Sequence, residues 1–305
     1  MTPQHAQPTA ERRRARRSDR PPSPRTVKDW ELVELAAEGA LAQTYRARPA
    51  HSAPDRPAAY ALKLLRRQWQ DDPRAVELLR REALLGQTVR HPHLISILAA
   101  SVKQPPYFVV APWLTGCTLA GRLGAGTPPD LPVALWTVRQ VAEALEALHA
   151  AGWRHGDVKP GNVFLSPEGH VTLLDLGFAR RVDETGSVVE RCVTGTCNYI
   201  APEMITSALR ADIRSDIYSL GVVLFEMLSG RLPFEGKDLA ELATLHRQAR
   251  APDLRRLVPH LPTAVIRLVR EMLAKQPLRR PQTPRELIDR LAAVGILTFG
   301  ERAWG

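Results

Sequence analysis

The sequence has few cysteines, few aromatic residues and no long apolar run, and each shortage excludes a class of protein. The three cysteines among 305 residues (Cys117, Cys192 and Cys197) have the spacing of neither a zinc site nor a disulfide framework. Unpaired thiols are typical of a reducing compartment. No apolar run approaches the ~20 residues that cross a bilayer, and the N-terminus lacks the apolar segment of a signal peptide. We therefore expect a cytoplasmic protein without a membrane span.

The net charge of +10 is concentrated at the N-terminus. Residues 1–26 are rich in arginine and proline and poor in apolar side chains, so we expect a disordered basic tail. One interpretation is an arm for acidic partners, either nucleic acid or anionic lipid; the other is a solvated tail without a partner. A nucleic-acid-binding protein is the weaker interpretation of the whole chain, because no recognised nucleic-acid-binding motif is present.

The hydrophobic pattern changes along the chain and predicts two lobes of different composition. The first part reads as five strands and one helix, with strands at 30–35, 43–47, 58–65, 94–102 and 107–111 and the helix at 73–89. The second part reads as helical, with main helices at 133–151, 215–229, 237–248, 263–274 and 284–293. We therefore predict an α+β, bilobal fold, with lobes at about 27–111 and 116–294, a connector at about 112–115 and a short C-terminal tail at 295–305.

The stretch His155-Gly156-Asp157-Val158-Lys159-Pro160-Gly161-Asn162 concentrates reactive side chains in one tight loop. Asp157 can accept a hydroxyl proton, Lys159 can neutralise a terminal phosphate, and Asn162 can hold a metal ion. The stretch resembles the catalytic loop of the protein kinases, and its Lys-Pro pair resembles the serine/threonine branch of that family. Thirteen residues after Asn162, Asp175-Leu176-Gly177 resembles the metal-binding Asp-Phe-Gly of the same family, with leucine as the apolar plug.

Further motifs follow the family's order. Lys63, on the expected third strand, can reach the α- and β-phosphates if an acidic partner directs it, and Glu82 on the following helix is the candidate. Gly195 to Glu203 resembles the end of a kinase activation segment, in which Thr196 would contact Asp157 and Lys159. Two long-range partners are implied as well: Arg280 for a buried Glu203, and Asp216 for the backbone of the catalytic loop.

The resemblance covers about residues 27–294 and points to the eukaryotic-like, Hanks-type serine/threonine protein kinases. It implies a bilobal protein-kinase-like fold, ATP with Mg²⁺ or Mn²⁺ as cofactors, protein substrates and a role in signalling by phosphorylation. The catalytic set would be Asp157, Lys159, Lys63 and Glu82, and the metal ligands would be Asn162 and Asp175. The alternative is a pseudokinase scaffold with weak or no catalysis; a small-molecule phosphotransferase of the same fold is a more distant third possibility.

The loop that covers the phosphates departs from the family's G-x-G-x-x-G pattern. Its best register is Ala37-x-Gly39-x-x-Ala42, followed by Thr44 where a valine usually lies over the adenine. Glycine lets backbone amides approach phosphate closely, whereas alanine adds a methyl group but adopts most of the same geometry where φ is negative. We therefore expect weaker or slower nucleotide handling.

Two further glycines stand where the family has larger side chains. Gly156 replaces an arginine that normally pairs with a phosphate on the activation segment, so we hypothesise that phosphorylation near Thr194 is not required for activity. Gly86 lies one turn after Glu82, where active kinases place an apolar side chain. The resulting gap would leave the helix loosely docked, unless Leu85 or a neighbour fills it.

The connector predicts how adenine is held. Counting back from Gly116 places Ala111 at the gate to the space behind adenine, which a small side chain leaves open. Leu114 would supply backbone hydrogen bonds to the base. Phe164 would lie beneath the ring and Ala61 above it, and bulky purine-like inhibitors should fit.

Overall fold

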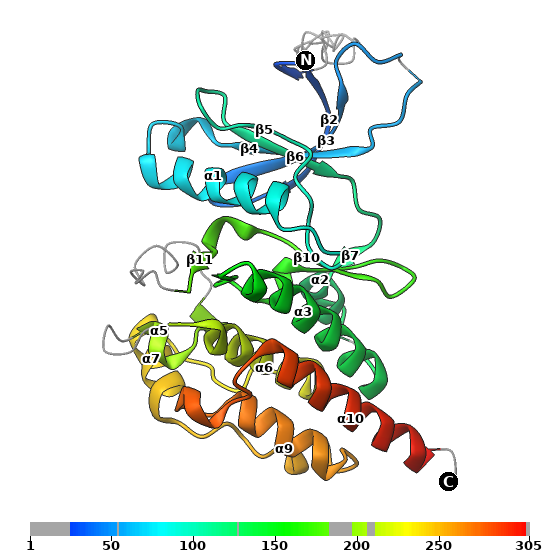
Figure 1. Cartoon of the computed structure of the whole chain (residues 1–305), viewed down its shortest axis with the longest axis vertical. Coiled ribbons are helices and arrows are strands. Elements are labelled where there is room, and N and C mark those ends of the chain that lie inside the picture. Colours follow the sequence, from blue (N-terminus) through cyan, green and yellow to red (C-terminus); the bar gives the residue numbers. More distant parts are fainter. Residues whose placement is uncertain (1–24, 54, 127, 183–196, 206–210, 303–305) are drawn as a thin grey trace, which may run out of the picture.

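The computed structural model describes residues 25–53, 55–126, 128–182, 197–205 and 211–302. It has two lobes, a curled sheet with one long helix and a larger, mainly helical lobe (Figure 1). The predicted α+β, bilobal architecture is therefore confirmed. In the part of the chain that the structure describes, no helix combines the length and apolarity needed to cross a membrane.

The N-lobe sheet is antiparallel and six-stranded, in the order β1-β2-β3-β4-β6-β5. The strands are β1 (Arg25–Val27), β2 (Trp30–Glu38), β3 (Ala42–Pro49), β4 (Tyr60–Leu65), β5 (Ala99–Ser101) and β6 (Phe108–Pro112). The sheet curls so far that Lys28, beside β1, donates a hydrogen bond of 2.6 Å to Ser101 in β5, at the other end of the strand order. The concave side encloses a small core that includes Val27 and Phe108.

Because of strand β1, the folded domain begins earlier than predicted. Arg25 and Thr26 fall in the stretch predicted as tail, but they pair with Leu32 and Glu31 of β2. The neighbouring Val27 is buried in the small core. Three residues with a single apolar side chain are too short a pattern to predict a strand. The segment is a strand because it pairs with β2.

The strand predicted at 94–102 is mostly absent, because its first residues bond to the other lobe. Ile95 donates its N–H to the carbonyl of Leu173 at 3.0 Å, and Leu173 donates to the carbonyl of His93 at 2.8 Å. These bonds join the N-lobe to strand β10 (Val171–Leu173) of the C-lobe. Only β5 remains to pair with β6.

Helix α1 (Pro73–Thr88) begins at Asp72, whose carboxylate accepts hydrogen bonds from the backbone N–H groups of Arg74 and Ala75. Pro73 at the first helical position is pre-set for the helix. One face of α1, with Leu79 and Ala83, is buried between the sheet and the short helical turn η3 (Leu176–Phe178) of the C-lobe. This helix therefore touches both lobes.

The C-lobe is built around α6 (Ile213–Ser229), which packs on α3 and α9. Its other helices are α2 (Leu119–Gly124), α3 (Leu131–Ala150), α5 (Pro202–Ile205), α7 (Leu239–Gln248), α8 (Leu254–Leu257), α9 (Thr263–Met272) and α10 (Pro284–Arg302). The short strands are β7 (Cys117–Thr118), β8 (Trp153–Arg154), β9 (Val163–Leu165), β10 and β11 (Arg180–Arg181). Of these, β7, β10 and β11 lie on the side of the C-lobe that faces the N-lobe (Figure 1). The 3₁₀ turns are η1 (Arg67–Trp69), η2 (Pro160–Asn162), η3, η4 (Cys197–Tyr199) and η5 (Pro277–Arg279).

Helix α10 is longer than predicted. The sequence pattern ended the helix at residue 293 and left 295–305 as a tail, but α10 continues to Arg302 and packs along α3 (Figure 1). Gly295 interrupts the pattern without ending the helix; a Cβ there would have no neighbour within 4 Å. A glycine inside a helix costs only about 1 kcal/mol, so packing of Leu291 and Val294 overrides it.

Candidate active site

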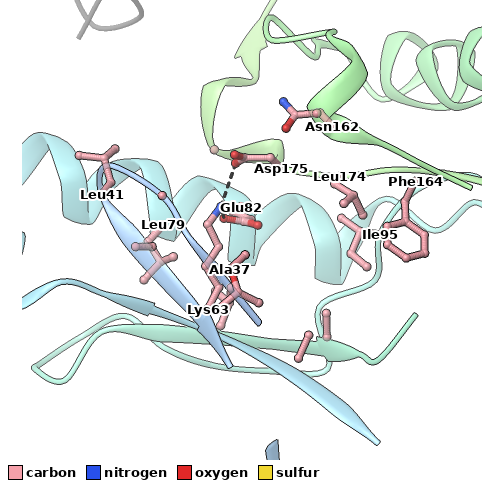
Figure 2. A pocket seen from close by; sticks show the side chains of 18 of the residues that line it. Ala37, Leu41, Lys63, Leu79, Glu82, Ile95, Asn162, Phe164, Leu174 and Asp175 are labelled. Carbon is pink, nitrogen blue, oxygen red and sulfur yellow. Dashed lines mark hydrogen bonds and ion pairs between the residues drawn. The ribbon is translucent and has the colours of Figure 1, made fainter. Parts of the chain in front are cut away.

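A cavity of about 670 Å³ lies between the two lobes, and residues of both line it. All the positions predicted to contact a nucleotide line this cavity: Ala37, Gly39, Ala42, Thr44, Ala61, Lys63, Ala111, Leu114 and Phe164. Figure 2 shows Ala37 and Lys63 reaching it from the sheet and Phe164 from the opposite lobe. Ala61 and Phe164 thus come from opposite lobes, as a base held between them requires.

Lys63 connects the sheet to both predicted carboxylate partners. Its Nζ donates to Glu82 Oε2 at 2.7 Å and to Asp175 Oδ1 at 3.0 Å (Figure 2). Alternation along β4 turns Lys63 toward the cavity, while Leu62 and Leu64 face the small core. Burial disfavours the ammonium form, but Asp175 and Glu82 outweigh it and raise the pKa of Lys63. The side chain is therefore a fixed positive charge.

Asp175 has an unusual backbone conformation, with φ of +61° and ψ of +76°. Left-handed non-glycine residues tend to occur at functional sites, where surrounding structure holds them. The next residue, Leu176, is fully buried, as expected of an apolar plug. Burial alone would raise the pKa of the Asp175 carboxyl, but Lys63 reverses the effect and the pKa is lowered. Asp175 is therefore ionised and suited to bind a cation.

Asp216 on α6 holds the backbone of the loop at 155–162. Its two carboxylate oxygens accept the N–H groups of His155 and Gly156, each at 2.7 Å. His155, which the sequence analysis did not single out, fixes the loop further. Its Nδ1 accepts the N–H of Asp157 at 3.1 Å, and its Nε2 donates to the carbonyl of Leu174 at 3.0 Å. The imidazole therefore ties the catalytic loop to the residue before Asp175.

Asp157 contacts the other two reactive side chains of the loop. Its Oδ2 lies 2.8 Å from Lys159 Nζ and 2.9 Å from the amide nitrogen of Asn162. Burial raises the pKa of the Asp157 carboxyl, and Lys159 opposes this only in part. A carboxylate with a raised pKa is a stronger proton acceptor, which suits a general base.

The chemistry of Asn162 and Asp175 fits a magnesium ion. The Asn162 amide nitrogen donates to Asp157, which leaves the amide oxygen as the ligand atom, and Asp175 offers a carboxylate. Within the described ranges no group of three or more histidine, cysteine or acidic side chains could hold a metal by itself. Magnesium commonly completes its octahedron with substrate phosphates and water, so two protein ligands suffice.

The sequence matches the family described as "Protein kinase domain" over residues 30–290. The chain belongs to the protein kinase family. Its kinase domain is 30% identical over 258 residues to the serine/threonine-protein kinase PrkC of Bacillus subtilis, a match covering 85% of this chain and 39% of PrkC. It is 33% identical over 270 residues to PknA of Mycobacterium tuberculosis (87% and 61%). It is 36% identical over 243 residues to pkn2 of Myxococcus xanthus (76% and 29%). The chain thus spans less than two thirds of each relative.

The phosphate-covering loop of this kinase domain tolerates its alanines. Among the described residues only Lys28 and Asp175 combine a side chain with positive φ, so Ala37 and Ala42 have backbones open to any residue. Gly39 donates its N–H to the carbonyl of Ala42 at 2.8 Å. From outside, Trp69 Nε1 donates to the carbonyl of Ala40 at 3.0 Å. The loop is therefore formed and anchored without its first and third glycines.

Of the two possibilities at Gly86, the structure shows the filled space and not the gap. Ile97 fills this space: a Cβ built on Gly86 would lie 2.3 Å from Ile97 Cγ1. The backbones also touch, because Ile97 donates its N–H to the Gly86 carbonyl at 2.9 Å. The residue that fills the space comes from the neighbouring segment of the lobe and not from Leu85 on the same helix.

The predicted ion pair holds the described end, residues 197–203, of the Gly195–Glu203 stretch, which we call the peptide-cradling segment. Arg280 donates to the two carboxylate oxygens of Glu203 at 2.6 and 2.8 Å, and both side chains are fully buried. A contact that the motifs did not predict lies nearby, where the Tyr199 hydroxyl donates to Glu226 at 2.8 Å. Thr194 and Thr196 lie outside the described residues.

Several apolar side chains that line the cavity were not predicted as site residues, namely Leu65, Leu79, Ile95, Ile97 and Leu174. Leu79 lies in the predicted helix at 73–89, and Leu65, Ile95 and Ile97 lie in predicted strands. Hydrophobic periodicity marks such residues as core and cannot tell which of them face an internal cavity.

Proposed function

We propose that this kinase domain is an active serine/threonine protein kinase, which transfers the γ-phosphate of ATP to serine or threonine hydroxyls of proteins in the cytoplasm. One observation carries the proposal: Lys63, Lys159, Asn162 and Asp175 line one cavity, with Lys63 bonded to Asp175 and Lys159 to Asp157. No fold requirement brings these polar groups together, and their mutual bonds keep them poised for a phosphate.

Each side chain has a role that its surroundings support. Lys63, directed by Glu82, would bind the α- and β-phosphates. Asp157 would orient the substrate hydroxyl and accept its proton, and Lys159 would neutralise charge on the transferred phosphoryl group. Asn162 and Asp175 would hold Mg²⁺, or Mn²⁺ in its place, which supplies charge neutralisation between the phosphates when bound.

Protein hydroxyls are the substrate class that the motifs favour. Lys159-Pro160 is typical of the serine/threonine branch, and the buried Glu203–Arg280 pair anchors a peptide-cradling segment that a small-molecule phosphotransferase would not need. The relatives PrkC, PknA and pkn2 are each named as a serine/threonine-protein kinase. Residues 1–24 of the basic tail lie outside the described residues, and contact with acidic partners stays a prediction.

A single-turnover assay with radiolabelled ATP and a generic protein substrate tests the proposal. Replacing Asp157 by asparagine keeps the size of the side chain and removes the proton acceptor. We expect phosphoryl transfer to fall by about 100-fold or more, since a general base contributes at least that much. Thermal unfolding of both proteins shows that the variant is folded. Equal signal from the wild type and the Asp157→Asn variant would favour the pseudokinase scaffold.

A further inference from the structure

Two close backbone approaches hold α1, one helical turn to each side of Glu82. On the N-terminal side, Gly177 of η3 lies so near that a Cβ there would be 3.1 Å from the Leu78 carbonyl oxygen. On the C-terminal side, Gly86 meets Ile97, with a backbone hydrogen bond of 2.9 Å from the Ile97 N–H to the Gly86 carbonyl. Leu78, Glu82 and Gly86 are spaced by four residues and therefore share one face of the helix.

The contact at Gly86 leaves no room for a side chain. A Cβ would lie 2.3 Å from Ile97 Cγ1, 3.0 Å from Ile97 Cβ and 3.1 Å from the Ile97 backbone nitrogen. Ile97 is buried in the core, and its backbone is bonded to α1, so it has little freedom to retreat. Any side chain at position 86 must therefore push α1 away from the segment that carries Ile97.

A shift of α1 would also move Glu82, whose carboxylate bonds to Lys63 in the site. The helix is a rigid rod over two turns, and Glu82 lies midway between its two glycine contacts. The Glu82 carboxylate is 2.7 Å from Lys63 Nζ, a distance that a shift of the helix by a few tenths of an ångström changes directly. Misplacement by 1 Å of a positioning group can cost about 100-fold in rate.

We propose that Gly86 is a positioning residue of this kinase domain. Its missing side chain lets α1 pack directly against Ile97 of the segment before β5, and this contact sets the direction of Glu82 toward Lys63. The inference rests on the proposed kinase function and adds to it the device that orders the Lys63–Glu82 pair.

The test is a compensating pair of variants assayed for kcat and for KM of ATP. Gly86→Ala should lower kcat by about tenfold. Combining it with Ile97→Ala, which removes the atom at 2.3 Å, should return kcat to within about threefold of the Ile97→Ala protein, because the remaining contacts at 3.0 and 3.1 Å require only a small shift. When Glu82→Gln is added to Gly86→Ala, kcat should fall by a clearly smaller factor than when it is added to the wild type, because the Lys63–Glu82 pair is already disordered.

Two control glycines separate positioning from loss of stability. A Cβ on Gly221 of α6 would lie 2.7 Å from Met272 Cβ, a comparable clash inside the C-lobe core. Gly221→Ala should lower the melting temperature while the folded protein keeps its kcat. A Cβ on Gly124 of α2 would meet nothing within 4 Å, so Gly124→Ala should change neither.

Hydrogen exchange of the α1 amides on the same proteins gives a readout that needs no catalysis. Faster exchange across residues 78–86 in Gly86→Ala than in Gly221→Ala supports the proposal even if the wild type proves inactive, which would contradict the proposed function alone. Three results would each overturn the positioning role. Gly86→Ala and Gly221→Ala have the same kcat, Ile97→Ala does not restore the kcat of Gly86→Ala, or Glu82→Gln lowers kcat by the same factor in the wild type and in Gly86→Ala.

Discussion

Gly156 has a backbone conformation that explains what glycine contributes to the catalytic loop. Its φ is +82°, in the left-handed region that L-amino acids with a side chain rarely adopt. Its N–H is held by Asp216 at 2.7 Å, so the conformation is fixed by the fold. The family's arginine would be strained there by about 1–2 kcal/mol. Glycine relieves this strain and gives up the guanidinium that would bind a phosphate.

Gly156→Ala should therefore lower the free energy of unfolding by about 1 kcal/mol, because alanine must adopt the same positive φ. Urea unfolding of both proteins measures the change. Gly161→Ala is the matched control in the same loop, since a Cβ there would be in ordinary contact, 3.9 Å from Lys159 Cε. Equal destabilisation by the two substitutions would show that backbone strain at Gly156 is not the cause.

Strands β4 and β6 line one side of the cavity between the lobes. Ala61 and Ala111 are register partners across these strands, so two small side chains stand side by side. The cavity continues past them to Ala75 and Leu79 on α1. A side chain larger than alanine at position 111 would separate the inner space from the adenine end.

We expect purine-like inhibitors with a bulky substituent directed at Ala111 to bind this kinase domain well. Ala111→Met should lower their affinity by at least about tenfold, because overpacking a filled space costs about 1–3 kcal/mol. Isothermal titration measures the affinity. The same purine without its substituent is the control and should bind both proteins alike. Retained affinity of the bulky compound for Ala111→Met would contradict the assigned position of Ala111 at the gate.

Most helices and strands could be predicted from local pattern, and the deviations have identifiable causes. Helix α1 follows from its capping Asp72, Pro73 and apolar face. The expected strand at 94–102 was wrong over its first residues, because the partner of Ile95 is Leu173, far away in sequence. The end of α10 was missed because Gly295 imitates a stop signal that tertiary packing overrides.

For the molecule as a whole, short motifs predicted which side chains meet at the site, while tertiary packing decided how they are held there. Lys63, Asp157 and Asp175 were assigned from motif spacing; Lys63 bonds to Asp175, and the charge of Asp175 acts on Asp157. The contact of Gly86 with Ile97 joins segments whose pairing no sequence period encodes. Such contacts depend on the distance of closest approach between elements, which a single sequence does not carry.

A buried histidine makes the stability of the domain depend on pH. His246 on α7 is fully buried, and its Nδ1 lies 3.0 Å from the Tyr218 hydroxyl of α6. Lys275, from the loop before η5, donates to the His246 carbonyl at 2.7 Å. Burial, with a smaller contribution from Lys275, lowers the pKa of His246 from 6.5 to about 4. His246 therefore links α6, α7 and the loop before η5, and its ionisation acts on the packing of the C-lobe.

The unfolded chain takes up a proton on this histidine below pH 6.5, whereas the folded domain does not until about pH 4. The stabilisation is therefore complete above pH 6.5 and is lost as pH falls, by about 2 kcal/mol at pH 5 relative to pH 7. Urea unfolding at both values measures this loss, which His246→Gln should largely abolish. His260→Gln, at an exposed histidine, is the control and should keep it. An undiminished loss in His246→Gln would assign the pH dependence to other groups.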